Sequence, residues 1–355
     1  MGAIIIVDAF WGDSGKGKIS AYLTRRENAE LCVRAGIGTN AGHSLYLGTL
    51  KELQLISTRQ LPLGFLNPLT MVAVGAGVAV NPSIFQEEVE KYHLQDRARV
   101  DYRCPIITEE HIKQEQESAH LSGKIGSTCS GSGAARADFV LRKAGQAKDI
   151  AGLQPYVTDV AYLVNKAARS GTVIVEGSQG ALLSLGLSPD YPYVTSGDCT
   201  SLAAAAQIGL GWQNISEAVM VLKALPSRVG EGPLPNELSA DEIKERGIAE
   251  HGVVTGRLRR KAVGIPWGLL RYVAILNSPT QIALTFCEHY DPEVEGVTTR
   301  ERLTPKVWEL ITKVEAQTGT PVTLVGTGKL FEHIVDLSER AAHSCVKSNN
   351  KKEFV

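Results

Sequence analysis

Residues 3–26 read AIIIVDAFWGDSGKGKISAYLTRR, and this stretch decides the fold. Residues 3–7 are apolar and mostly β-branched, which predicts a buried parallel strand that stops at Asp8. A glycine-rich turn follows at residues 10–18, and Ile19–Arg26 has the pattern of a helix. A strand, a glycine-rich turn and a helix in this order are typical of α/β domains that bind phosphate groups.

Strand and helix patterns alternate along the rest of the chain. The predicted strands are Thr70–Val74, Thr172–Val175, Ala218–Leu222, Gln281–Thr285 and Pro321–Leu324. The predicted helices are Pro82–Tyr92, Gln154–Ala168, Ser201–Gly209, Lys261–Ile275 and Pro305–Gln317. This alternation predicts an α/β fold with a mainly parallel central sheet flanked by helices. Because no low-complexity linker divides the chain, we expect one domain over residues 1–355 with long functional loops, and a flexible polar tail at 344–355.

The composition excludes several broad classes of protein. The chain has 355 residues, of which 43% are hydrophobic and 21% charged, and its 37 Lys and Arg nearly cancel its 38 Asp and Glu. A net charge of −1 argues against a general nucleic-acid or membrane-surface binder. The six cysteines form no CxxC pair, which disfavours structural zinc. No basic leader and no apolar run of 18 residues is present, so we expect a cytoplasmic protein with reduced thiols.

The segment 12–18 satisfies most of a P-loop pattern. However, Ile19 stands where that pattern needs Ser or Thr to bind Mg²⁺, which argues against an ordinary P-loop GTPase. Asp13 is a carboxylate inside a loop that would otherwise attract phosphate, so we expect it to hold a metal ion or to move a proton. Lys16 or Lys18 would supply positive charge. An ordinary glycine-rich turn with solvated lysines is the alternative.

A second loop, residues 36–43, contains three glycines and ends in Asn40, two small residues and His43. Its small residues permit close approach of the backbone. A lone histidine is more often structural than catalytic, but the glycines around His43 favour a functional role.

Six motifs in sequence order resemble those of the adenylosuccinate synthetases. They are Trp11–Lys18, Asn40–His43, Glu176–Gly180 (EGSQG), Tyr191–Ser196 (YPYVTS), Ser227–Pro233 and Thr255–Arg260. The resemblance implies a P-loop-related α/β fold, a ligase that forms a C–N bond, Mg²⁺ as cofactor and a homodimer.

The resemblance also implies a reaction in two steps. An aspartate removes the proton from purine N1 while a nucleoside triphosphate phosphorylates O6, and the amine of L-aspartate then displaces that phosphate at C6. Transferred by motif, Asp13 would be the base and a Mg²⁺ ligand, and the carbonyl group of Gly42 would be another ligand. His43 would stabilise the transferring phosphoryl group, and Gln179 would face the purine edge.

Binding residues are implied in the same way. The triphosphate would contact Gly12, Gly15, Lys16, Gly17, Lys18, Gly42, His43, Ser44, Arg259, Glu288, Gly326, Thr327 and Gly328. The monophosphate would contact Ser14, Asn40, Ser127, Thr128, Gln179 and Thr195, with Arg142 supplied by a partner subunit. L-Aspartate would contact Val254, Thr255, Gly256 and Arg257, whose planar guanidinium suits a carboxylate.

One departure from the family pattern bears on the monophosphate. Ser14 stands where the family has Glu, and a small hydroxyl leaves room for, and can accept a hydrogen bond from, an exocyclic 2-amino group. From this we expect dGMP in place of IMP, as in a viral branch of the family that makes N6-succino-2-amino-2′-deoxyadenylate for diaminopurine nucleotides. The protein would then work in the cytoplasm of a host cell.

Two further departures bear on the energy donor. Phe286-Cys287-Glu288 replaces a run in which an Asp pairs with guanine, and Gly326–Lys329 replaces a Thr-Gly-Pro run. Together they favour ATP or dATP, although Glu288 could still reach the N–H groups of GTP. Two alternatives remain: an ordinary adenylosuccinate synthetase that uses IMP and GTP, and a non-catalytic nucleotide-binding regulator.

Overall fold

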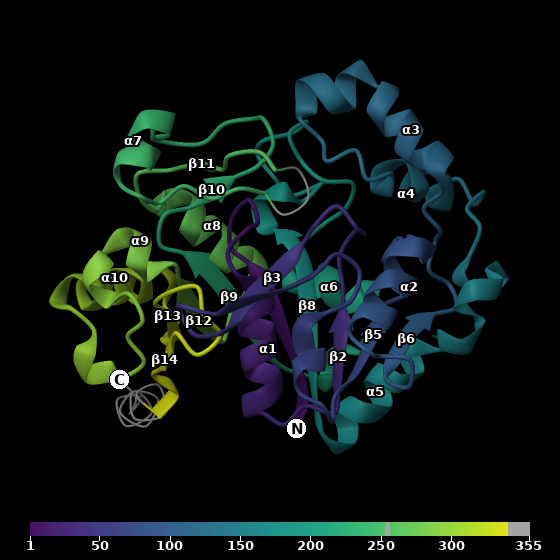
Figure 1. Ribbon diagram of the computed structural model, residues 1–355, viewed down its shortest axis with the longest axis horizontal. Helices are drawn as coiled ribbons and strands as arrows, with labels where there is room; N and C mark the ends of the chain where they lie inside the picture. The colour runs from purple at the N-terminus through teal and green to yellow at the C-terminus, as the bar shows by residue number, and fades with distance from the viewer. Residues whose placement is uncertain (253–255, 340–355) are drawn as a thin grey trace, which may run out of the picture.

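A single sheet of ten strands forms the centre of the computed structural model, which describes residues 1–252 and 256–339. The strand order is β14-β13-β12-β9-β1-β8-β2-β5-β6-β7 (Figure 1). Every neighbouring pair is parallel except β13 and β14, which are antiparallel. The bounds are β1 (Gly2–Asp8), β2 (Leu31–Arg34), β5 (Met71–Val74), β6 (Ala98–Asp101), β7 (Val157–Thr158), β8 (Thr172–Gly180), β9 (Ile215–Lys223), β12 (Gln281–Thr285), β13 (Val322–Gly326) and β14 (Ile334–Asp336). The predicted fold class is confirmed.

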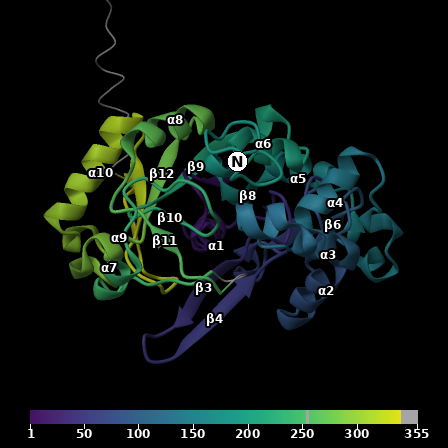
Figure 2. The same cartoon turned by 90° about the horizontal axis from the view of Figure 1, so that it is seen from above.

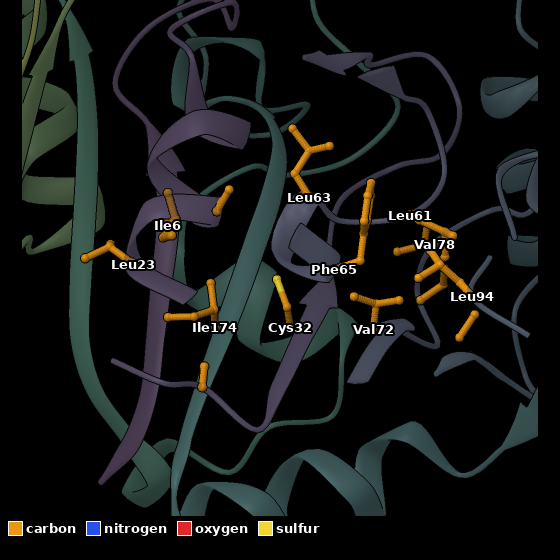
Figure 3. Close-up of a cluster of buried hydrophobic side chains, with 14 of the residues drawn as sticks. Ile6, Leu23, Cys32, Leu61, Leu63, Phe65, Val72, Val78, Leu94 and Ile174 are labelled. Carbon is orange, nitrogen blue, oxygen red and sulfur yellow. The ribbon is translucent and has the colours of Figure 1, made fainter. Parts of the chain in front are cut away.

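Helices cover both faces of this sheet. They are α1 (Lys16–Arg26), α2 (Pro82–Lys91), α3 (Glu109–Glu117), α4 (Ser132–Val140), α5 (Val160–Ser170), α6 (Ser201–Gln207), α7 (Ala240–Glu245), α8 (Trp267–Asn277), α9 (Cys287–Tyr290) and α10 (Pro305–Thr318). Side chains alternate along a strand, so Ile6 of β1 packs with Leu23 of α1 and Ile174 of β8 (Figure 3), whereas Ile5 packs in a second cluster with Val164 of α5. Burial on both faces explains why β1 is continuously apolar.

The predicted first residues of two helices were wrong. The pattern Gln154–Ala168 is split: its first residues form a 3₁₀ turn containing Pro155 and the short strand β7, and α5 begins only at Val160. The pattern Lys261–Ile275 begins with a strand residue, and α8 starts after Pro266. Proline removes a backbone donor and restricts the residue before it, which overrides the apolar periodicity. Helix α1, by contrast, begins earlier than predicted, inside the glycine-rich turn.

Two antiparallel pairs of strands in the described part of the chain lie outside the main sheet. Strands β3 (His43–Gly48) and β4 (Leu53–Thr58) are antiparallel and project from the body of the molecule (Figure 2). Strands β10 (Ser227–Arg228) and β11 (Arg260–Lys261) form a second antiparallel pair. No helix among residues 1–252 and 256–339 has the length and apolar character needed to cross a membrane. The predicted tail at 344–355 lies outside the described residues, and the single domain stays a prediction.

Charged residues stand at or near the carboxyl ends of four adjacent strands. They are Lys223 of β9, Asp8 of β1, Glu176 of β8 and Arg34 of β2, and each is at most 2% exposed. Ligands of open α/β sheets bind at this edge. The parallel topology therefore gathers buried charge at one place, and the candidate site lies there.

Candidate active site

A cavity of about 1010 Å³ opens at the carboxyl edge of the sheet. Most of the residues predicted from sequence line it, although they come from separate parts of the chain. The predicted residues in its wall are Gly12, Asp13, Ser14, Gly15, Lys16, Gly17, Lys18, Asn40, Gly42, His43, Ser44, Ser127, Thr128, Gln179, Thr195, Arg259, Glu288, Gly326 and Gly328. One cavity of this size can hold several small ligands at once.

Asp8 organises the first glycine-rich loop. One carboxylate oxygen accepts hydrogen bonds from the backbone N–H groups of Phe10 (2.8 Å) and Gly12 (3.3 Å), and the other lies 3.3 Å from Lys16 Nζ. Gly15, at φ +79°, precedes α1 without any side-chain cap, and no acidic residue occupies the first turn. The N–H groups at the start of α1 are therefore available to an anion in the cavity.

Asp13 has a left-handed backbone, with φ +60°, and its carboxylate faces three donors. Oδ2 lies 3.4 Å from Lys223 Nζ and 3.2 Å from Ser227 Oγ, and it is also paired with Arg259 Nε. No hydrogen bond to Oδ1 is found among residues 1–252 and 256–339. One oxygen is thus fixed by the protein while the other can accept a proton or bind a cation.

His43 is oriented by a buried carboxylate. Oε1 of Glu176 accepts from Arg34 Nη1 at 2.6 Å and lies 2.6 Å from His43 Nδ1, and Arg34 Nη1 lies 2.5 Å from the same His43 nitrogen. Arg34 also donates to the carbonyl of Ala41 at 2.9 Å, which fixes the loop before His43. Gly17 makes the approach possible, because an added Cβ there would lie 2.8 Å from His43 Cβ. His43 Nε2 is left toward the cavity wall, 3.4 Å from the carbonyl of Ser178.

The charges of this triad shift its pKa values. Burial, followed by the positive charge of Arg34, lowers the pKa of His43 to about 4 against the opposing effect of Glu176. Burial alone would raise the pKa of Glu176, but His43 and Arg34 beside it lower that pKa to about 2. At neutral pH the triad therefore holds an ionised Glu176 and a neutral, fixed imidazole.

Three predicted monophosphate residues form one hydrogen-bonded chain. Gln179 Nε2 donates to Asn40 Oδ1 at 2.8 Å, and Asn40 Nδ2 donates to Thr195 Oγ1 at 3.2 Å. The buried Gln179 Oε1 has no hydrogen-bond partner among the described residues. Since an unpaired buried polar atom costs free energy, this oxygen is an open acceptor for a ligand.

Lys18 does not point into the phosphate region. Its ammonium donates to the carbonyl groups of Gly328 (2.8 Å) and His333 (2.9 Å), and burial lowers its pKa to about 8 although Glu288 opposes this. Burial also raises the pKa of Glu288 to about 7, and Glu288 Oε2 is buried without a hydrogen-bond partner in the described part of the chain. Lys18 thus fixes a loop beside a second open acceptor.

The other predicted residues lie in less direct positions. Thr327 is buried and donates to the carbonyl of Val297, so it supports the wall without lining the cavity. Arg142 is exposed and lies outside the cavity of its own chain. Arg257 Nη1 donates to the carbonyl of Gly126 at 3.3 Å, and Gly256 is adjacent to it in the loop. Val254 and Thr255 lie outside the described residues.

Sequence reasoning missed the charged residues that orient the site. Asp8, Arg34, Glu176, Lys223 and Glu250 had no assigned role, although Glu176 lies in a quoted motif. A signal was available, because a charged residue that ends an apolar run of a parallel strand falls at the ligand-binding edge of the sheet. This signal applies to four of the five, since Glu250 follows a loop.

The fold and the site together indicate a class of enzyme. An open helix N-terminus, a held carboxylate and an oriented histidine in one cavity are suited to an enzyme that moves phosphoryl groups and protons. The model of the family "Adenylosuccinate synthetase" matches residues 5–154 and 150–292. The chain belongs to the adenylosuccinate synthetase family, and it is a ligase that forms C–N bonds.

The chain is similar to curated relatives over almost its whole length. It is 44% identical to adenylosuccinate synthetase of Pyrococcus horikoshii over 340 residues, which covers 95% of this chain and 98% of the relative. It is 45% identical to the enzyme of Archaeoglobus fulgidus over 339 residues, with the same coverage.

Two solved structures share the fold. Adenylosuccinate synthetase from Plasmodium falciparum, fully ligated, has a TM-score of 0.84 at 21% identity and covers 95% of this chain and 100% of its own. Cyanophage S-2L succinoaminodeoxyadenylate synthetase, bound to dGMP and dATP, has a TM-score of 0.78 at 22% identity and covers 98% and 99%. These likenesses concern the fold alone.

The comparisons correct the expected reaction. The prediction of a dGMP-using, ATP-driven enzyme was wrong, because full-length relatives at about 44% identity are named adenylosuccinate synthetase. A position in the viral branch is not confirmed, since the phage enzyme is only 22% identical. The prediction depended on Ser14, whose buried Oγ lacks a hydrogen-bond partner in the described chain. A hydroxyl can both donate and accept, so Ser14 by itself does not select a 2-amino purine.

Proposed function

We propose that this enzyme is an ordinary adenylosuccinate synthetase, which joins L-aspartate to C6 of IMP with GTP as the energy donor. The observation that carries the proposal is Asp13, whose Oδ2 is held by Lys223, Ser227 and Arg259 while Oδ1 remains open in the cavity. A carboxylate held in this way can remove a ring proton.

The proposed reaction has two steps. Asp13 removes the proton from N1 of IMP, and O6 attacks the γ-phosphate of GTP, which releases GDP and gives 6-phosphoryl IMP. The amine of L-aspartate then attacks C6, inorganic phosphate leaves with O6, and the amine loses a proton. Glu176 holds His43 through Nδ1, so Nε2 would have to carry a proton to donate a hydrogen bond to the phosphoryl group as it moves to O6, and the negative charge of Glu176 would stabilise that protonated ring.

Mg²⁺ fits the oxygen atoms present at this place. The carboxylate of Asp13 and the carbonyl of Gly42 are hard oxygen donors in the same cavity wall. No cluster of three or more His, Cys, Asp or Glu suited to a metal is found among residues 1–252 and 256–339. This agrees with a magnesium ion that is held by one carboxylate and by substrate phosphates. When bound, the ion would neutralise charge on the triphosphate.

We propose that the purine base of the energy donor binds at Glu288. Its unpaired Oε2 can accept hydrogen bonds from N1–H and N2–H₂ of guanine, a pair of donors that adenine lacks. Lys18 holds the backbone of the neighbouring loop at Gly328, which would form the other side of the base site. GTP can therefore donate two hydrogen bonds to Glu288 from one edge of its base, which the base of ATP cannot do in the same way.

We propose that IMP and L-aspartate bind at the residues predicted from the sequence. Gln179 and Asn40 would face the purine of IMP, and its 5′-phosphate would lie at Ser127, Thr128 and Thr195. Arg142 of the partner subunit would complete this site in a homodimer. Ser14 would lie near the base. L-Aspartate would bind the loop that contains Val254, Thr255, Gly256 and Arg257.

A product assay tests the proposal directly. Enzyme, Mg²⁺ and L-aspartate are mixed with either IMP or a guanine monophosphate, and with either GTP or ATP. The products are identified and quantified by mass spectrometry. We expect adenylosuccinate and GDP from the mixture of IMP and GTP, at a kcat/KM at least tenfold above the other combinations. Greater turnover of a guanine monophosphate than of IMP would contradict the proposal.

A further inference from the structure

Asp13 is surrounded by cations that are themselves held by one residue, Glu250. Glu250 follows α7 and lies in the cavity wall. Its Oε2 accepts from Lys223 Nζ at 2.8 Å and from Lys261 Nζ, and it lies 3.8 Å from His289 Nδ1. Glu250 lies outside the six family motifs.

The first link from Glu250 to Asp13 runs through Lys223. The ammonium of Lys223 is 2% exposed and has three acceptors: Glu250 Oε2 at 2.8 Å, Ser227 Oγ at 2.9 Å and Asp13 Oδ2 at 3.4 Å. The ring of Phe286 lies 4.1 Å from Nζ and closes another side. An ammonium has three protons to donate, so these acceptors fix its position completely.

The second link runs through the backbone. The carbonyl oxygen of Glu250 accepts from the N–H of Arg259 at 2.8 Å, and the side chain of Arg259 pairs with Asp13 Oδ2. Both cations that contact Asp13 are therefore held by Glu250, one by its carboxylate and one by its main chain.

The charge balance explains why a carboxylate is needed there. Lys223, Lys261 and Arg259 bring three positive charges into a space where each side chain is at most 8% exposed. Asp13 alone would face all three. With Glu250 ionised, Lys223 is shared between two carboxylates and is kept from closing fully on Asp13.

We propose that Glu250 is a positioning residue for the base Asp13. Its carboxylate keeps Lys223 at 3.4 Å from Oδ2 and its main chain keeps Arg259 beside the same oxygen, so that Oδ1 stays available to the substrate. This inference rests on the proposed function, in which Asp13 removes the proton from N1.

The test is the variant Glu250→Gln, which keeps the shape of the side chain and removes its charge. We expect kcat to fall roughly 10- to 100-fold, within the range of general-base effects, while KM for IMP changes less than threefold. Glu250→Asp restores the charge and should recover part of the lost kcat. Glu237→Gln is the matched control, because Glu237 pairs with Arg260 in the same region and does not contact Asp13; its kcat should match wild type.

A double-mutant cycle shows whether Glu250 acts through Lys223. If it does, Glu250→Gln combined with Lys223→Met lowers kcat no more than Lys223→Met alone. Circular dichroism and IMP binding by calorimetry check that each variant is folded. Wild-type kcat in folded Glu250→Gln, or losses that multiply in the double variant, would overturn the inference. Absence of turnover in the wild type with IMP and GTP would instead refute the proposed function.

Discussion

The ammonium of Lys18 lies 2.8 Å from the carbonyl oxygen of Gly328, and this contact joins the first glycine-rich loop to the loop that follows β13. A second bond, to the carbonyl of His333 at 2.9 Å, secures the same loop. The buried ammonium therefore acts as a fixed link between two walls of the cavity, one proposed for phosphate and the other for the donor base.

Replacement of Lys18 by methionine should free the loop after β13, which contains Gly328 and is proposed to bind the base of GTP. We expect Lys18→Met to raise KM for GTP roughly tenfold while KM for IMP stays within twofold, since two hydrogen bonds to a charged donor contribute about 1.5–3 kcal/mol each at most. Steady-state kinetics with each substrate varied measures both values. Lys306→Met is the control, because Lys306 is exposed and donates to one surface carbonyl, that of Tyr290. Equal changes in the two KM values would refute this role.

Asp13→Asn should abolish turnover without abolishing binding. The amide keeps the size of the side chain but cannot take a proton, so kcat should fall by roughly 10³-fold, as for other general bases. Calorimetry should still detect IMP and GTP. The control is Asp138→Asn, since Asp138 contacts His111 and does not line the cavity. Retained turnover in Asp13→Asn would exclude the proposed base.

A comparison of Glu176→Gln with His43→Asn should separate the effect of His43 orientation on kcat from the effect of the buried ion pair on the stability of the fold. Loss of the Glu176 charge leaves Arg34 buried without its carboxylate, so we expect destabilisation of about 3–5 kcal/mol together with a loss of kcat. His43→Asn should lose kcat by roughly 10²-fold with a much smaller change in stability, because Arg34 and Glu176 remain paired. Chemical denaturation and kinetics measure the two effects. A fully active, folded Glu176→Gln enzyme would show that His43 needs no orienting partner.

Glu288 makes stability depend on pH in a defined direction. Burial raises its pKa from the usual 4.5 to about 7, so the folded protein binds the proton more tightly than the unfolded chain. The contribution of this proton binding to the free energy of unfolding is complete below pH 4.5. It is lost as the pH rises through 7, by up to about 3 kcal/mol. Glu288→Gln should therefore melt with wild type near pH 4 and at a higher temperature at pH 8.

Thermal melts of both proteins from pH 4 to pH 9 measure this difference. Glu309→Gln, at an exposed position of α10, is the control and should follow wild type throughout. A stabilisation by Glu288→Gln that is greatest at low pH would contradict the buried carboxylate.

The central sheet could be predicted because its strands have a strong local pattern. The continuous apolar run at β1 and the glycine-rich turn after it specify a buried strand followed by a helix, and the structure contains both. Helix starts were less predictable where proline opposes apolar periodicity, as at Pro155 and Pro266. The antiparallel strand β14 is only three residues long, too short to give a pattern.

The candidate site could be predicted only where residues lie in compact motifs. Asp13 and His43 each stand in a glycine-rich loop and were found. Lys223 and Glu250 lie 27 positions apart, and their ion pair depends on the packing of a loop against β9, which no local pattern specifies. The direction of Lys18 was not predictable for the same reason, because its two acceptors are more than 300 residues away in the chain.

The fate of the oxygen at C6 tests the central claim most directly. Enzyme, GTP, Mg²⁺ and L-aspartate are incubated with IMP that carries ¹⁸O at O6, and the inorganic phosphate is analysed by mass spectrometry. If O6 is phosphorylated and then displaced by the amine, one ¹⁸O atom appears in each phosphate released, together with one adenylosuccinate. Phosphate without the label, or label that leaves as water, would contradict the account.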